Sequence, residues 1–184
     1  MIYVYLAGGF EEIEAITSID ILRRSEKDVT VVGVGDNIIV GAHGIPVVCD
    51  TIAQEVPLND ELEMIVLPGG MPGTLNLEKN SYVQEAIDFC VKNNKFIAAI
   101  CAAPSILGHR GILAGKTAVC YEGFESQLDG AKIGTASVVQ DGNIITAKGP
   151  GVSVDFGLKL VSALKSEADS ARIRKSMLCE NYEQ

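Results

Sequence analysis

The residues with the clearest chemical potential lie in the segment "AAICAAP", where Cys101 stands between an apolar run and a proline. The run before Cys101 predicts a buried strand, and Pro104 is typical of the first turn of a helix, where its missing N–H costs nothing. Cys101 would then occupy a sharp strand–turn–helix corner that resembles a nucleophile elbow, with Ala102 and Ala103 as small neighbours. A thiol beside a helix start is expected to have a depressed pKa and to react as a thiolate.

Simple packing is the alternative for this cysteine, because cysteine is among the most buried residue types. The chain has five cysteines, an odd number, with no C-x-x-C pair, and only His43 and His109 could join them as metal ligands. A disulfide framework and a zinc site are therefore not expected. We predict a site that works without a metal or another cofactor.

A glycine pair follows another apolar run, in "EMIVLPGGMPG". Glycine lets the backbone turn its N–H groups toward a ligand, as an oxyanion hole requires. The N–H groups of Gly70 and Ala102 are therefore predicted to form such a pair, with a plain turn as the alternative. No G-K-[ST] completes a phosphate loop at this glycine pair, and "AGGFEE" is not the G-x-G-x-x-G of a dinucleotide fingerprint.

Three carboxylates open the helix predicted in "FEEIEAITSIDILRR". The macrodipole explains Glu11 and Glu12 adequately. Glu14 shares its side of the helix with Ser18 and Ile21, so we expect it at the margin of the apolar face, partly desolvated and with a raised pKa. Beside Cys101 it could hydrogen-bond the sulfur and shuttle a proton; the alternative is an ordinary solvated helix residue.

A second thiol, Cys120, closes the segment "KTAVC", which predicts another strand end near the same edge. A buried strand cysteine is the alternative. A disulfide between Cys101 and Cys120 is a further alternative.

The elements that must position these residues alternate along the chain. Apolar runs of strand length are separated by amphipathic stretches, which predicts an α/β fold with a mostly parallel sheet covered by helices on both faces. Residues 37–50 are expected to form a hairpin, and Asp141 and Gly142 predict a second one. A helix follows over 152–164, and the tail over 166–184 is predicted to be one more helix capped near Ser166.

Composition limits the partners. The chain has 184 residues, 47% of them hydrophobic, and a net charge of -9 at pH 7. This length predicts a single domain over residues 1–184, and the negative charge opposes binding to nucleic acid or an anionic membrane. With no basic leader and no apolar run approaching the ~20 residues of a membrane span, a cytoplasmic protein is expected.

Taken together, these segments resemble the ThiJ/PfpI superfamily, in the branch of the parkinsonism-associated deglycase. The resemblance rests on five segments in the family's order: "LAGGFEEIEA", "IVLPGG", "AAICAAPSIL", "GKTAVCYEGFE" and "ITAKGPGVSVDFGLKLV". It implies a flavodoxin-like three-layer sandwich, doubly wound and of the class I glutamine amidotransferase type, and a homodimer. It also implies Cys101 as the reactive cysteine, Glu14 as its partner, and Gly70 and Ala102 as amide donors.

The family is associated with glutathione-independent glyoxalase and deglycase activity, with sensing of oxidative stress and with chaperone action. The chain departs from it twice: protease-like members carry His directly after the nucleophile, where this chain has Ala102, and many relatives have His in place of Cys120. A cysteine protease is therefore the least favoured reading. The first hypothesis is conversion of a small carbonyl substrate, an α-oxoaldehyde such as methylglyoxal, to lactate. The second is a redox sensor in which Cys101 is oxidised to sulfinic acid.

Overall fold

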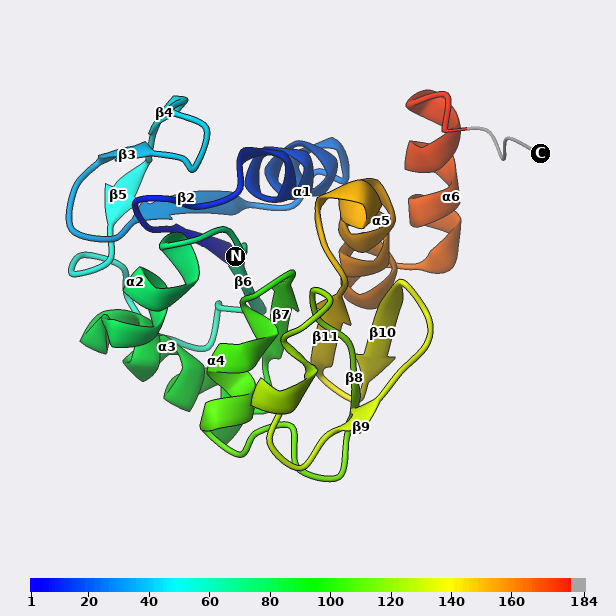
Figure 1. Cartoon of the computed structure of the whole chain (residues 1–184). Coiled ribbons are helices and arrows are strands. Elements are labelled where there is room, and N and C mark those ends of the chain that lie inside the picture. Colours follow the sequence, from blue (N-terminus) through cyan, green and yellow to red (C-terminus); the bar gives the residue numbers. More distant parts are fainter. Residues whose placement is uncertain (180–184) are drawn as a thin grey trace.

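One sheet of seven strands forms the middle of the molecule (Figure 1), in the order β10-β11-β7-β6-β1-β2-β5. The computed structural model describes residues 1–179. The strands are β1 (Ile2–Leu6), β2 (Val29–Gly33), β5 (Thr51–Ile52), β6 (Met64–Leu67), β7 (Phe96–Ile100), β10 (Val138–Asp141) and β11 (Ile144–Ala147). Every neighbouring pair is parallel except β10 with β11. The predicted, mostly parallel sheet is confirmed.

Helices cover both faces of this sheet, which confirms the three-layer architecture (Figure 1). One side carries α1 (Glu12–Arg24) and α5 (Ser153–Leu164), with α6 (Glu167–Ser176) packed against α5. The other side carries α2 (Gly73–Lys79), α3 (Ser81–Lys92) and α4 (Pro104–His109). Side chains of β1 alternate between the two resulting cores: Ile2 and Val4 pack toward α1 and α5, Tyr3 and Tyr5 toward α3. This alternation follows from the two-residue period of a strand.

The strand order places a topological switch point between β1 and β6. From β1 the chain crosses to β2 on one side, whereas β6, β7 and β11 lie on the other. Ligands in open α/β sheets bind where the loops diverge at such a point, beyond the carboxyl ends of the strands. The loops that follow β1, β6 and β7 are the ones that carry the residues singled out above.

Two hairpins are found where the sequence predicts them. β3 (Ile38–Val40) pairs antiparallel with β4 (Pro46–Val48), and β10 pairs antiparallel with β11 around Gly142, whose φ is 61°. Left-handed backbone of this kind suits glycine in a tight turn.

The segment that contains Cys120 differs from its prediction. β8 (Thr117–Ala118) ends before Cys120 and pairs with β9 (Lys132–Ile133) in a small sheet of its own. The expected strand end at Cys120 is therefore wrong. A run of a few apolar residues cannot distinguish a sheet strand from a buried loop, because both bury their side chains.

The tail forms the predicted helix, but a shorter one. Ser166 caps α6 by accepting a hydrogen bond from the N–H of Asp169 at 3.1 Å, as expected. The helix ends at Ser176, so its continuation over 177–179 is wrong. Residues 180–184 of the prediction lie outside the described part of the chain.

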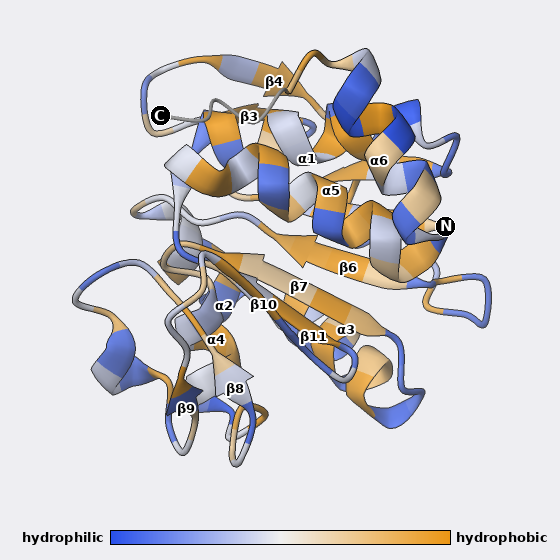
Figure 2. Cartoon of the chain, turned by 90° about the vertical axis from the view of Figure 1, so that its right-hand side faces the viewer, coloured by the Kyte–Doolittle hydropathy of each residue, from blue (hydrophilic) through white to orange (hydrophobic). Residues whose placement is uncertain are grey.

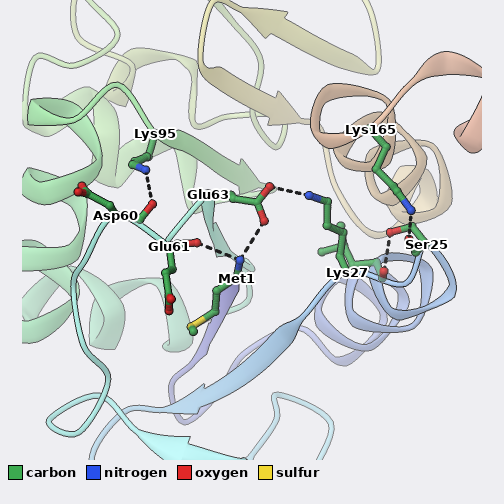
Figure 3. Close-up of polar contacts among 9 residues, drawn as sticks. Met1, Ser25, Lys27, Asp60, Glu61, Glu63, Lys95 and Lys165 are labelled. Atoms are coloured by element: carbon green, nitrogen blue, oxygen red, sulfur yellow. Dashed lines mark hydrogen bonds and ion pairs between the residues drawn. The ribbon is translucent and has the colours of Figure 1, made fainter.

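The amino ends of the strands are joined by charged groups (Figure 3). The terminal amine of Met1 and the Lys27 amine both bind the carboxylate of Glu63, at 2.9 and 2.5 Å. Nearby, Lys95 donates to the carbonyl of Asp60, and Lys165 ties the end of α5 to the carbonyl of Ser25 at the end of α1. Two ion pairs and two lysine–carbonyl hydrogen bonds thus lie at the edge opposite the loops of the site.

The strands of the central sheet are mostly hydrophobic, whereas hydrophobic and hydrophilic residues alternate along the helices (Figure 2). Within residues 1–179 we find no helix that combines the length and apolar character needed to cross a bilayer.

Candidate active site

Cys101 stands directly after β7 in a left-handed backbone conformation, with a φ of 65°. An L-residue rarely adopts this conformation, which costs on the order of 1–2 kcal/mol, so the surrounding structure must hold it. Two hydrogen bonds do so: the Cys101 N–H donates to the carbonyl of Ala147 at 2.9 Å, and the Cys101 carbonyl accepts from the N–H of Tyr121 at 2.8 Å. With α4 starting at Pro104, the predicted elbow geometry is confirmed.

The glycine pair after β6 faces this elbow. The N–H groups of Gly70 and Ala102 both donate toward the Cys101 sulfur. Gly70 has a φ of 88°, and a Cβ there would lie 2.4 Å from the backbone nitrogen of Glu11. Gly70 must therefore be glycine on two grounds, its backbone conformation and its close approach to the loop after β1. Both amides lie where the sequence predicts donors to a reacting group.

Glu14 lies in α1 and is completely buried. Its Oε2 accepts a hydrogen bond from the N–H of Gly69 at 2.8 Å, and its side chain also hydrogen-bonds Cys101. Its Oε1 has no hydrogen-bond partner among residues 1–179. The sequence places Glu14 at the margin of the apolar face, but the structure buries it fully, because the loop after β6 closes over the start of α1.

Burial decides the proton affinity of this pair. It raises the pKa of the Cys101 thiol to about 12, with further increases from the charge and hydrogen bond of Glu14. The N–H groups of Gly70 and Ala102 lower the pKa but do not offset these effects. The predicted depressed pKa of the thiol is therefore wrong. α4 has only six residues, so its dipole contributes little.

Burial also raises the pKa of Glu14, to about 7, against the opposing hydrogen bond from Gly69. Because the two groups interact directly, their protons titrate as a pair. Below about pH 7 both groups carry a proton, and above it they hold one between them. A thiolate arises in this state when the proton is on Glu14.

A cavity of about 250 Å³ opens above the sulfur of Cys101. Its walls are mainly carbon, from Met71, Phe124 and Pro150 among others, and within residues 1–179 Glu11 is the one charged residue that lines it. The sequence explains Glu11 by the macrodipole alone and so misses this position. Only the fold reveals it, because Glu11 immediately precedes α1 and is carried to the cavity by the turn after β1.

Glu12 and His43 form a contact that the sequence does not indicate. Burial would raise the pKa of Glu12, but hydrogen bonds from the ring and backbone of His43 lower it. The contact fastens the β3–β4 hairpin to the start of α1. Glu11, Glu12 and His43 bring three potential metal ligands within 4.8 Å of one another. Both oxygens of Glu12 are already used by these hydrogen bonds, which accounts for the cluster without an ion.

Cys120 and the second histidine are not brought to the cavity. Tyr121 lines the cavity, but the Cys120 side chain is buried in the opposite core, and burial raises its pKa to about 11. The backbone after Cys120 thus lies beside Cys101, as predicted, but the Cys120 thiol does not. His109 lies at the end of α4 against Glu78. No histidine within residues 1–179 lines this cavity.

Comparison with known proteins gives consistent matches. The sequence profile of the DJ-1/PfpI family matches residues 1–163. Protein dj-1beta of Drosophila melanogaster is 34% identical over 178 residues, which cover 95% of each chain. The glutathione-independent glyoxalase DJR-1.2 of Caenorhabditis elegans is 32% identical over 168 residues, covering 91% of this chain and 89% of the relative. The solved structure of oxidized Toxoplasma gondii DJ-1 superimposes with a TM-score of 0.92 at 33% identity, covering 96% of this chain and 97% of that one.

Replacing Gly69 with alanine should lower the free energy of unfolding by about 1–3 kcal/mol, the usual cost of overpacking. The new Cβ would lie 2.6 Å from the Cβ of Cys101 and 2.9 Å from Oε2 of Glu14. Chemical denaturation measures the change. Gly8→Ala is the matched control, because a Cβ there meets nothing within 4 Å. Equal stability of the two variants would contradict the close packing of this pair.

Proposed function

The chain belongs to the DJ-1/PfpI family, and we propose that it is a cysteine-dependent enzyme that converts small α-oxoaldehydes to hydroxy acids without glutathione or another cofactor. The observation that carries this proposal is the buried carboxyl of Glu14 hydrogen-bonded to the elbow thiol of Cys101 beneath two N–H groups. A relative, DJR-1.2, bears the name of such a glyoxalase.

The first step is addition of the Cys101 sulfur to the aldehyde carbon of methylglyoxal. A carbon–sulfur bond forms, and the proton held by the pair passes to the aldehyde oxygen, which gives a hemithioacetal. The N–H groups of Gly70 and Ala102 point at the sulfur. They are therefore next to the oxygen on which negative charge develops, where they stabilise it.

The second step moves a proton between adjacent carbons. Glu14, ionised after the addition, removes the hydrogen from the former aldehyde carbon and returns it to the neighbouring carbon, while the hydroxyl proton of the first carbon passes to the ketone oxygen of the second. The first carbon is thereby oxidised to a thioester, and the second is reduced to an alcohol. Water then hydrolyses the thioester, releases lactate and restores the thiol. Deglycation of an amine adduct would begin with the same addition.

A pKa of Glu14 near the working pH suits this exchange, because both its protonation states are then accessible. Below about pH 7 the pair holds two protons, and Glu14 cannot act as a base. Activity is therefore expected to fall as the pH decreases through this value.

Cys101→Ser should abolish lactate formation from methylglyoxal, and Glu14→Gln should reduce kcat/KM by at least about a hundredfold, the usual contribution of general acid–base catalysis. The fall in kcat/KM below about pH 7 should be absent in Glu14→Gln, since the carboxyl that causes it is gone. Lactate assays across pH measure both effects. Cys179→Ser, which alters a thiol outside the cavity, is the control. Undiminished turnover by Cys101→Ser rules out the mechanism.

A second candidate function, redox sensing, is supported by the same geometry. Cys49, Cys90 and Cys120 are buried. Cys101 and Cys179 are half-buried, and of these two Cys101 lines the cavity. Oxidation of Cys101 by two equivalents of peroxide would give a sulfinate, whose oxygens could accept from the nearby amides and from protonated Glu14. An oxidized form of a relative has been solved.

Mild peroxide treatment followed by intact-mass and peptide analysis tests this second function. We expect the addition of two oxygen atoms at Cys101 before any other cysteine reacts, and slower formation of this product in Glu14→Gln. Similar oxidation of all five cysteines speaks against sensing. Efficient methylglyoxal turnover by the same preparation favours the enzyme.

A homodimer is the third part of the proposal. α1 and the β3–β4 hairpin expose a set of large apolar side chains, called here the apolar patch: Ile13, Ile16, Ile38, Val40, Ile45 and Val48. Contiguous exposed apolar surface commonly marks a protein interface. The hairpin is held beside the start of α1, because it is bonded to the loop after β1 through the N–H of Gly9 and the carbonyl of Phe10. A second copy of this chain is the occupant implied by the family resemblance.

Val48→Lys should weaken the dimer by at least about tenfold, because it places a charge where apolar area is buried. Val48 is 72% exposed in the single chain, so its replacement should leave folding intact. Sedimentation across a range of concentrations measures the association. Ile133→Lys makes the same kind of change on β9, outside the patch, and should leave association unaltered. A monomeric wild-type chain would refute the proposal.

A further inference from the structure

A second cavity adjoins the one above Cys101. It measures about 390 Å³ and is lined by Glu122, Lys148, Val152 and neighbouring backbone. Tyr121 and Pro150 line both cavities, so the two share a wall. Small-molecule sites usually measure roughly 300–1,000 Å³. The reactive cavity alone lies below this range, and the pair together falls within it.

The ring of Tyr121 is held in place at this shared wall. Its backbone N–H binds the carbonyl of Cys101, and a Cβ at Gly149 would lie 3.1 Å from Cδ2 of the ring. The ring thus packs against bare backbone on one side, while 48% of the residue remains exposed. An exposed, positioned aromatic ring beside a reactive group is suited to contact an apolar part of a ligand.

The lining of the reactive cavity disfavours charged ligands. Met71, Phe124 and Tyr121 offer carbon surface, while Glu11 places a carboxylate on the wall. In the second cavity Glu122 and Lys148 have opposite charges and are exposed to solvent. An anionic ligand, such as an α-keto acid, would be repelled by Glu11 and by the net charge of -9. A methyl group would leave most of the apolar surface uncovered.

We propose that the preferred substrates are uncharged α-oxoaldehydes with a bulky apolar substituent, an aryl group above all, that lies against Met71 and Phe124 and extends across Tyr121 toward the second cavity. This inference rests on the proposed α-oxoaldehyde chemistry at Cys101 and adds the part of the substrate that does not react. Tyr121 acts here as a specificity-determining residue.

The first test compares kcat/KM for phenylglyoxal, measured as mandelate formed, with kcat/KM for methylglyoxal. We expect the wild type to prefer phenylglyoxal by at least about tenfold, within the range for added apolar contact in a pocket. Tyr121→Ala should lose most of this preference, and Tyr121→Phe should keep it. Tyr82→Ala is the matched control, because Tyr82 is a similarly exposed tyrosine on α3 that lines neither cavity.

A second test does not depend on turnover. Cys101 is alkylated with iodoacetamide or with N-phenyliodoacetamide, in which the sulfur forms a bond to carbon as iodide leaves and the thiol proton passes to solvent. Rates are divided by those of the same reagents with glutathione. The phenyl reagent should be favoured by the wild type and by Tyr121→Phe, and not by Tyr121→Ala.

The outcomes separate the two proposals. Cys101-dependent turnover of methylglyoxal with no preference for the phenyl compounds in either test overturns the inference and leaves the proposed function intact. A phenyl preference in alkylation without turnover of either aldehyde supports the apolar subsite and refutes the glyoxalase. A preference that survives in Tyr121→Ala overturns the role of Tyr121.

Discussion

The site depends on one interaction, the hydrogen bond between a fully buried carboxyl and a half-buried thiol that together hold a single proton above about pH 7. Burial makes both the thiolate and the carboxylate costly, so the pair keeps one proton and exchanges it between sulfur and oxygen. Two exposed groups would each lose their protons independently. The backbone is built around this pair. Gly69 has no room for a side chain, Gly70 turns its N–H toward the sulfur, and Cys101 is held in a conformation that costs energy.

The two ends of the strands carry different kinds of contact. At their amino ends, the carboxylate of Glu63 binds both the terminal amine and Lys27. At their carboxyl ends the loops diverge at the switch point, and backbone N–H groups are directed toward a reacting atom. Parallel strands impose this asymmetry, because all of them present the same end to the same edge of the sheet.

The start of α1 connects the reactive pair to the surface of the molecule. Three carboxylates within about one helical turn have different roles there: Glu11 lines the cavity, Glu12 holds the β3–β4 hairpin through His43, and Glu14 binds Cys101. Ile13, between them, points outward into the apolar patch. A helix brings such a set together because successive side chains leave its axis in different directions.

The sequence by itself determined the layered α/β fold, the elbow at Cys101, the glycine loop and the candidate partner Glu14, because these depend on local patterns: strand-length apolar runs, a proline at a helix start and helical spacing. It could not determine how deeply Glu14 is buried, that the thiol pKa rises, or that the Cys120 thiol turns away into the opposite core. Nor could it show that Glu11 and Tyr121 line the same cavity. Desolvation and the assembly of a cavity depend on distant segments packing together, and only the tertiary structure decides which ones meet.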